Sequence, residues 1–168
     1  MAKSIHHLHD IAEQAGILVK SASLPERVEG LYVETTRLRA ILLNQSLGDE
    51  TCAQHCALAE ELGHHFTSSG DCLIHTGSDP ASVGRAEERA KRWAAEELVP
   101  LADIVDAFQN GCHNRSEVAE FLGVTEVFLM ECVGVYLRRY GKWVILPGGF
   151  AICFDPFGVL QMQEMGEL

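Results

Sequence analysis

The residues best suited to chemistry lie in one short stretch, Leu58 to His65, with the sequence LAEELGHH. On a helix, Glu60 and His64 stand four positions apart, so their side chains project from one face and can bind the same metal ion. Glu61 lies about 100° further around the helix, beside that pair. Glutamate–histidine pairs at this spacing are also common on solvated helix faces, so the pair alone does not establish a metal site.

The same stretch is a variant of the HExxH arrangement, in which two metal ligands flank a catalytic carboxylate. Glu61 takes the place of the general base, and His64 takes the place of the closing ligand. The first ligand position holds Glu60 where that arrangement has histidine. Because carboxylate oxygens and imidazole nitrogens both bind zinc, the variant still has a suitable set of donor atoms.

A second helical stretch follows at residues 85–100. Together the two stretches resemble the ImmA/IrrE family of metallopeptidases, which pairs a HELGH-type helix with a helix of the form E-x-x-A-x-x-(F/W)-A-x-x-x-L-x-P. The EELGH form, followed by Thr-Ser-Ser-Gly-Asp, looks like the branch associated with phages and mobile elements. Six residues match the second motif in register: Glu87, Ala90, Trp93, Ala94, Leu98 and Pro100.

The resemblance covers most of residues 30–159. Gly30-Leu31-Tyr32 and the strand end at Leu43-Asn44 are similar to the N-terminal hairpin of the family. Residues 118–125 and 154–159 are similar to the same branch. The two helix motifs in this order are far more specific than either motif alone.

The resemblance implies a zinc-dependent endopeptidase that cleaves a helix-turn-helix repressor protein. It assigns Glu60, His64 and Glu87 as metal ligands and Glu61 as general base. Three protein ligands leave a fourth zinc position for a water molecule, which the metal acidifies. Glu61 would then take a proton from that water and pass it to the leaving amine.

Glutamate at position 60 changes the expected electrostatics of the site. Two carboxylates cancel the formal charge of a divalent cation, whereas two histidines and one glutamate cancel less of it. The site should therefore acidify water and polarise a carbonyl more weakly, and we expect a slow enzyme unless its own substrate or an activator is bound. Oxygen ligands also relax the preference for zinc, which leaves manganese and iron(II) as alternative metals.

Three further residues could assist at the site. His65 follows the expected ligand but points to another face of the helix, where it could support a ligand or contact the substrate. Tyr32, at the start of a predicted strand, could hydrogen-bond an oxyanion. His75, in a loop rich in Gly, Ser and Pro, could approach the metal or the transition state. The alternatives are a partly exposed surface role for the histidines and a core position for Tyr32.

The pattern around these motifs predicts an α+β fold. We expect a small N-terminal β-hairpin or sheet packed on a zincin-like two-helix metal core, then a helical C-terminal part and a terminal strand pair. Trp93 and Ala94 repeat with Ala90 and Leu98 at three- and four-residue steps, which predicts that they are buried. Helices are expected at residues 5–15, 49–66, 86–99, 101–109, 114–122 and 125–139, strands at 17–19, 31–33, 38–43, 143–146 and 150–154, and a surface loop up to Gly84.

The domain organisation follows from the order of these elements. Residues 1–100 are expected to form the metallopeptidase core, and residues 101–168 a helical C-terminal subdomain with a closing β-hairpin, the two packed as one compact unit. Residues 116–129 have the sequence pattern of a helix-turn-helix, two helices joined through a turn that contains glycine. The second helix begins with Thr125-Glu126 rather than with residues that read bases, so we interpret it as a packing or partner-docking module.

Charge and composition narrow the classes of function. The chain of 168 residues has 13 Lys plus Arg and 24 Asp plus Glu, a formal net charge of −11. Such a chain repels nucleic acid, whereas it attracts a basic protein partner. It has no apolar run long enough to span a membrane, and its start lacks the apolar stretch of a secretory signal. With six cysteines and no CxxC pair, we expect a cytoplasmic protein with reduced thiols.

Three function classes are considered, of which a DNA-binding regulator rests only on the helix-turn-helix pattern near Val118 and conflicts with the net charge. The other two compete. The first is a cytoplasmic metallo-endopeptidase whose partner is a protein substrate, with no direct binding of nucleic acid or membrane. The second is a non-catalytic regulator of the same fold that docks a transcription factor through its acidic surface. Metal content separates them, because stoichiometric zinc favours the peptidase and a folded protein that binds no metal favours the regulator.

Overall fold

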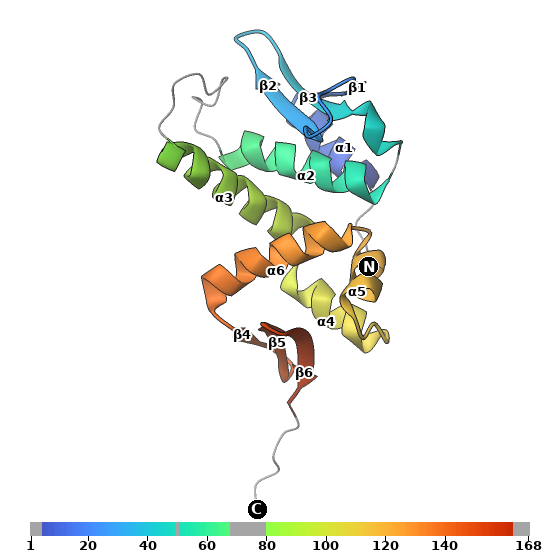
Figure 1. Ribbon diagram of the computed structural model, residues 1–168, viewed down its shortest axis with the longest axis vertical. Coiled ribbons are helices and arrows are strands. Elements are labelled where there is room, and N and C mark those ends of the chain that lie inside the picture. The colour runs from blue at the N-terminus through green and yellow to red at the C-terminus, as the bar shows by residue number, and fades with distance from the viewer. Residues whose placement is uncertain (1–4, 50, 68–79, 163–168) are drawn as a thin grey trace, which may run out of the picture. The chain divides into compact units, whose positions relative to one another are not determined.

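The computed structural model describes residues 5–49, 51–67 and 80–162, and it confirms the mixed α+β fold. The chain divides into two compact units, residues 3–98 and residues 99–168 (Figure 1). The elements of the first unit are α1 (Ile5–Gln14), β1 (Leu18–Ala22), β2 (Gly30–Glu34), β3 (Arg39–Asn44), η1 (Gln45–Leu47), α2 (Cys52–Thr67) and α3 (Pro80–Leu98). Those of the second are α4 (Leu101–Gln109), α5 (Arg115–Leu122), α6 (Glu126–Tyr140), β4 (Trp143–Leu146), β5 (Phe150–Phe154) and β6 (Phe157–Gln161).

The sheet of the first unit has the order β1-β3-β2, with β1 parallel and β2 antiparallel to β3. The predicted hairpin is therefore present, and β1 extends it. The central strand β3 buries Ile41 and Leu43 almost completely. At its end, the side-chain amide of Asn44 donates to the carbonyl oxygens of Leu24, Pro25 and Val28, at 3.3, 3.2 and 2.8 Å. These bonds fix the loop that leads into the edge strand β2.

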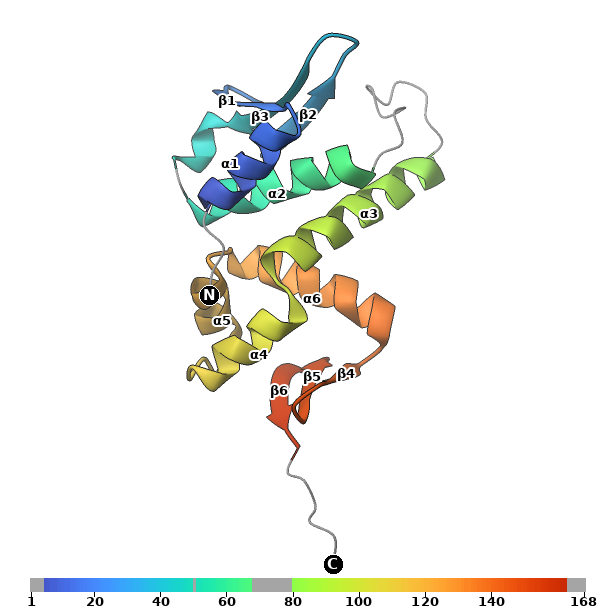
Figure 2. The ribbon, with the colours of Figure 1, turned by 180° about the vertical axis from the view of Figure 1, so that it is seen from behind.

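Helices α2 and α3 pack against each other, and α1 and the sheet pack on α2 (Figure 2). The prediction of a surface loop up to Gly84 is wrong for residues 80–84, because α3 already begins at Pro80. Proline suits the first turn of a helix, where its missing N–H has no partner in any case. The prediction that Ala94 is buried is confirmed, whereas Trp93 is only partly buried.

The second unit begins with three helices, and their bounds agree with the predicted ranges to within one residue. The side chain of Asn114 accepts a hydrogen bond from the backbone N–H of Glu117 at 3.0 Å and so caps α5. Gly123 ends α5 in the left-handed conformation, with a φ of 69°. Thr125 caps α6 by accepting from the N–H of Phe128 at 3.1 Å. The expected helix–turn–helix is therefore formed.

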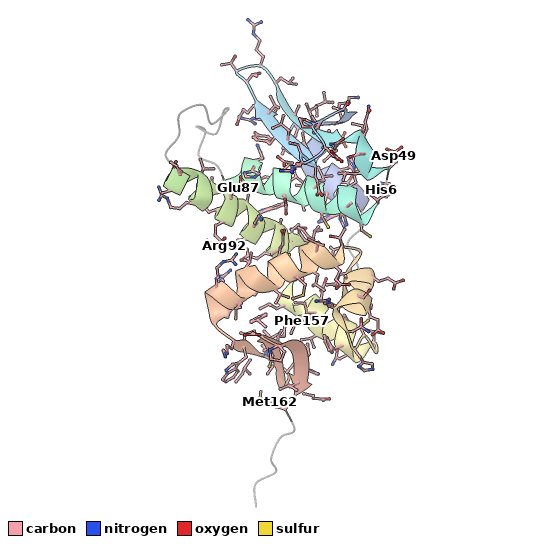
Figure 3. The ribbon with its side chains drawn as sticks, in the orientation of Figure 1. His6, Asp49, Glu87, Arg92, Phe157 and Met162 are labelled. Carbon is pink, nitrogen blue, oxygen red and sulfur yellow. The ribbon has the colours of Figure 1, made fainter. Side chains whose placement is uncertain are left out.

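The predicted terminal strand pair is a three-stranded antiparallel sheet of order β4-β5-β6. The added strand β6 follows a two-residue turn, since Phe154 pairs with Phe157. Ile152 and Phe154 of β5 are buried. Phe157, which Figure 3 labels on β6, meets Phe108 of α4 edge to face, with 6.2 Å between ring centroids.

Candidate metal centre and active site

Helices α2 and α3 come closest at Gly63. A Cβ atom at this position would lie 3.0 Å from both the Cα and the carbonyl carbon of Ala90, and would overlap the carbonyl oxygen of that residue. The facing side of α3 presents small buried residues, Ala86, Ala90 and Ala94. Only glycine allows this backbone contact, and the contact brings the next residue of α2, His64, beside α3.

The predicted ligands His64 and Glu87 face each other across the helix pair. His64 Nε2 lies 3.5 Å from Glu87 Oε1, and Glu87 projects from α3 beside α2 (Figure 3). The His64 side chain is 20% exposed and that of Glu87 is 49% exposed, so solvent reaches both. Glu60, the third predicted ligand, is half-buried one turn before His64. Within residues 5–49, 51–67 and 80–162, no three His, Cys, Asp or Glu side chains are gathered as a ready-made metal site.

The Glu61 carboxylate is directed toward the edge strand β2. Its Oε2 accepts a hydrogen bond from the backbone N–H of Tyr32 at 2.7 Å. Burial, above all, raises the pKa of the Glu61 carboxyl to about 7, and the charges of Glu60 and Glu87 add to the rise, while the Tyr32 N–H opposes it. The carboxylates of Glu60 and Glu87 therefore both lie close enough to Glu61 to act on it electrostatically.

Gly30 is the reason that Glu61 can approach β2 so closely. A Cβ atom at position 30 would lie 2.7 Å from Glu61 Cγ and 3.0 Å from Glu61 Oε1. Any larger side chain would therefore push the carboxylate away from the Tyr32 amide. The sequence pattern singles out the Gly-Leu-Tyr segment, but the contact with Glu61 depends on tertiary packing.

The Tyr32 hydroxyl lies between two partners. It donates to Glu34 Oε2 at 3.1 Å and lies 2.7 Å from Nδ1 of His65. Arg39 Nε in turn donates to Glu34 Oε1 at 2.8 Å. Burial and the Glu34 carboxylate raise the pKa of Tyr32 to about 12, and burial lowers the pKa of His65. Tyr32 and His65 are thus brought together, as a hydrogen-bonded pair that joins β2 to α2.

Glu34 and Arg39 are site-supporting residues that the sequence interpretation missed. They pair directly across the β2–β3 hairpin. The signal was available, because opposite charges at the facing ends of the strands predicted at 31–33 and 38–43 favour a cross-strand ion pair. Both side chains are partly exposed, so their contribution to stability is small.

His65 begins a row of rings that crosses from α2 to α3. Its ring meets Phe66 edge to face at 4.8 Å, and Phe66 stacks on Trp93 at 5.2 Å. Phe66 is itself 46% exposed, so Trp93, which stacks on it, lies near the surface and is only partly buried. His75, the remaining predicted candidate, lies outside the described residues.

The chain matches the model of the Peptidase M78 family, described as the IrrE N-terminal-like domain, over residues 12–131. That match covers more than half of the 168 residues. The chain belongs to the M78 peptidase family. The match confirms the resemblance to ImmA/IrrE proteins, and it includes β2, α2 and α3, which hold the candidate site. No curated protein matches the chain.

M78 peptidases are typically metal-dependent, and the donor atoms of this chain fit a divalent cation. His64 and Glu87 already face each other at 3.5 Å, and Glu60 and Glu87 both act on the buried carboxylate of Glu61. One imidazole nitrogen and two carboxylates are accepted zinc ligands, and a cation would relieve the repulsion among the carboxylates. Over the described part of this M78 chain, no helix has the length and apolar character that crossing a bilayer requires.

Proposed function

We propose that this M78 chain is a zinc-dependent endopeptidase that cleaves a helix-turn-helix repressor, with Glu61 as general base. The observation that carries the proposal is the facing pair His64 and Glu87, 3.5 Å apart, beside the buried carboxylate of Glu61. Manganese or iron(II) could replace zinc, because two of the three ligands are carboxylates.

Each residue has a defined part in the proposed reaction. Glu60, His64 and Glu87 would hold the metal, which supplies an acidified water and a Lewis acid for the scissile carbonyl. Glu61 takes a proton from the attacking water and gives it to the leaving amine. The Tyr32 N–H holds the Glu61 carboxylate in place at 2.7 Å. The hydroxyl of Tyr32 and the ring of His65 keep β2 and α2 in register for this contact.

Strand β2 offers a path for the substrate backbone because it is an edge of its sheet. The N–H of Thr35 donates to the carbonyl oxygen of Leu38, and the carbonyl oxygen of Glu29 accepts from the N–H of Asn44. Hydrogen bonding alternates along an antiparallel strand, so the odd-numbered residues of 29–35 bond to β3. Gly30, Tyr32 and Glu34 therefore direct their backbone groups away from β3. An extended peptide that pairs with the Tyr32 carbonyl and the Glu34 N–H would run past Glu61.

The proposed substrate class rests on the resemblance and on charge. A chain of net charge −11 attracts a basic protein, and a DNA-binding repressor has a basic face. Location in the cytoplasm, where such a repressor acts, is part of the same proposal.

Substitution of one proposed metal ligand should show whether His64 and Glu87 form a metal site or only a surface ion pair. We expect purified wild-type protein to contain about one zinc per chain, and Glu87→Gln to lose most of it because an amide oxygen is a weaker ligand than a carboxylate. Zinc at about a hundred times its Kd should stabilise the wild type by about 2.7 kcal/mol, and the variant much less. Elemental analysis and thermal melting with added zinc measure both effects.

Glu96→Gln is the control for that experiment, since Glu96 is an exposed glutamate later on the same helix. It should keep both the zinc and the stabilisation. Equal zinc content in the wild type and Glu87→Gln would contradict the ligand assignment.

Gly30→Ala should reduce cleavage much more than it reduces stability. The new methyl group would meet the side chain of Glu61, which can rotate away, so unfolding should change by less than about 1 kcal/mol. A misplaced base, however, costs about 10²-fold in rate. Initial cleavage rates and thermal melting measure the two effects.

Gly158→Ala is the control, because a Cβ there meets nothing within 4 Å. Equal cleavage rates in Gly30→Ala and the wild type would argue against the proposed placement of Glu61.

A second candidate function is a non-catalytic regulator that docks a transcription factor. The observation in its favour is that the described residues hold no ready-made group of three ligands. A chain that stays folded, takes up no zinc and still binds the repressor would replace the peptidase proposal with this one.

A further inference from the structure

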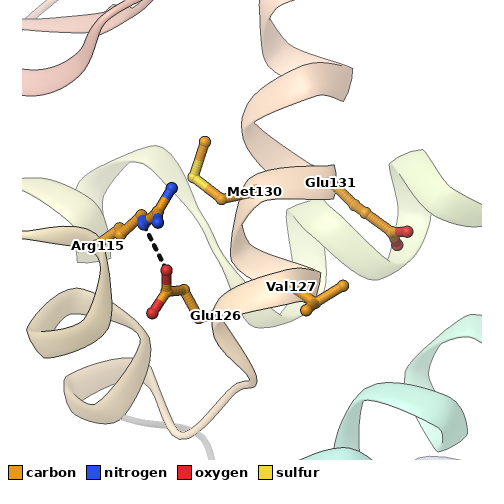
Figure 4. A pocket seen from close by; sticks show the side chains of 5 residues that line it. All are labelled: Arg115, Glu126, Val127, Met130 and Glu131. Carbon is orange, nitrogen blue, oxygen red and sulfur yellow. Dashed lines mark ion pairs between the residues drawn. The ribbon is translucent and has the colours of Figure 1, made fainter.

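The helix–turn–helix of the second unit carries a groove on its surface. Its volume is about 620 Å³. In Figure 4, Arg115, Glu126 and Met130 lie on one side of α6, and Val127 and Glu131 lie on the other. Arg115 and Glu126 form an ion pair that joins the first turns of α5 and α6. The groove lies wholly within residues 115–131 and is separate from the candidate metal centre in the first unit.

The apolar residues of this groove are not needed by the core. Helix α6 already buries one face, which includes Phe128, Leu129, Cys132 and Val133. Val127, at the start of the same helix, is 73% exposed. Val127, on one side of α6, and Met130, on the other, are the two apolar side chains that line the groove. Outward apolar side chains with charged neighbours are typical of a protein-binding surface.

The charges around the groove specify the kind of partner. Of the residues that line the groove, Glu126 and Glu131 are acidic and Arg115, which is paired with Glu126, is basic. The same helix–turn–helix carries two further glutamates on α5, at positions 117 and 120. This surface repels DNA and is complementary to lysine and arginine side chains. An amphipathic helix that places apolar residues in the groove and basic residues against the glutamates satisfies both features.

We infer that the groove around Val127 and Met130 is a docking site for a basic amphipathic helix of the substrate protein. The identity of that protein as the substrate rests on the proposed peptidase function, whereas the binding itself does not. Docking at this site, which belongs to the second unit, would select the substrate by its basic helix, while cleavage takes place in the first unit. The chain would then bind its substrate before it cleaves it.

A binding measurement tests the inference without cleavage. The probe is a synthetic helical peptide with leucines on one face and lysines on the other, and the protein is the full chain carrying Glu61→Gln. We expect Val127→Gln to weaken peptide binding about tenfold. Leu160→Gln, the same kind of change at a 60% exposed position on β6, should leave binding unchanged. Raised salt should weaken binding, and a peptide with glutamates in place of the lysines should not bind.

Each outcome decides the matter. A selective loss in Val127→Gln together with dependence on lysine supports the docking site. Three results would overturn it. Val127→Gln could bind the peptide as tightly as the protein without that change, Val127→Gln and Leu160→Gln could lose binding equally, or the peptide could bind equally well without its lysines. Thermal melting confirms that both variants fold, which is expected because both side chains are exposed. Failure here leaves zinc binding and cleavage untouched, while failure of the peptidase proposal leaves the peptide affinity unchanged.

Discussion

Glu61→Gln should abolish cleavage of the repressor while leaving the protein folded. General-base catalysis contributes about 10²–10⁴-fold to rate, and a neutral amide cannot accept the proton. Glutamine has nearly the shape of glutamate, and its carbonyl oxygen can still accept the hydrogen bond that the Tyr32 N–H now gives to Glu61 at 2.7 Å. Co-expression of the wild type or the variant with a helix-turn-helix repressor of the proposed substrate class, followed by detection of the fragments, measures the loss.

The control for this experiment is Glu88→Gln, the same change on α3 at a residue beside the assigned ligand Glu87. It should cleave as the wild type does. Glu61→Gln should also bind as much zinc as the wild type, because Glu61 is not among the assigned ligands. Cleavage by Glu61→Gln at the rate of the wild type would remove Glu61 from the mechanism, and cleavage by neither protein would favour the non-catalytic regulator.

The helices were predictable because their signals are local. Three- and four-residue periodicity identifies α2 and α3, and the helices predicted at 114–122 and 125–139 agree with α5 and α6 to within one residue. The start of α3 was misplaced because glycine and serine near Gly84 are typical of loops. In the structure, α3 extends back to Pro80, and proline is favoured in the first turn of a helix.

Strands were harder to predict where their pairing is remote. The hairpin of β2 and β3 is local, and its strands were predicted at residues 31–33 and 38–43. The terminal strand β6 was missed because its turn, Asp155-Pro156, lacks the Asn-Gly or Asp-Gly pair that marks a tight hairpin. The contact of its Phe157 with Phe108 of α4 joins residues far apart in the sequence and so depends on tertiary packing.

The same distinction applies to the candidate site. Helical spacing alone puts Glu60 and His64 on one face, and the motif on α3 points to Glu87. The hydrogen bond from Tyr32 to Glu61 depends on an edge strand and a helix that meet at Gly30, and no local pattern encodes that contact. Sequence therefore indicates the chemical groups, while packing decides which atoms hold them in place.

Gly63→Ala should both destabilise the first unit and separate the proposed ligands. The added methyl group would overlap the carbonyl oxygen of Ala90 and lie 3.0 Å from its Cα, and a helix backbone cannot rotate away as a side chain can. Overpacking of this kind costs about 1–3 kcal/mol. Any relief comes from moving α2 away from α3, which lengthens the 3.5 Å distance between His64 Nε2 and Glu87 Oε1. Chemical denaturation and zinc titration should therefore both show a loss.

Gly84→Ala makes the same substitution in α3 at a position where a Cβ meets nothing within 4 Å. It should stabilise the protein by about 0.5–1 kcal/mol, because alanine favours the helix, and it should leave zinc affinity unchanged. Because Gly63→Ala should lower the free energy of unfolding and Gly84→Ala should raise it, the pair distinguishes the effect of helix propensity from that of the contact between α2 and α3. If Gly63→Ala were as stable as the wild type and bound zinc as tightly, the close approach of α2 and α3 could not be what positions His64 and Glu87.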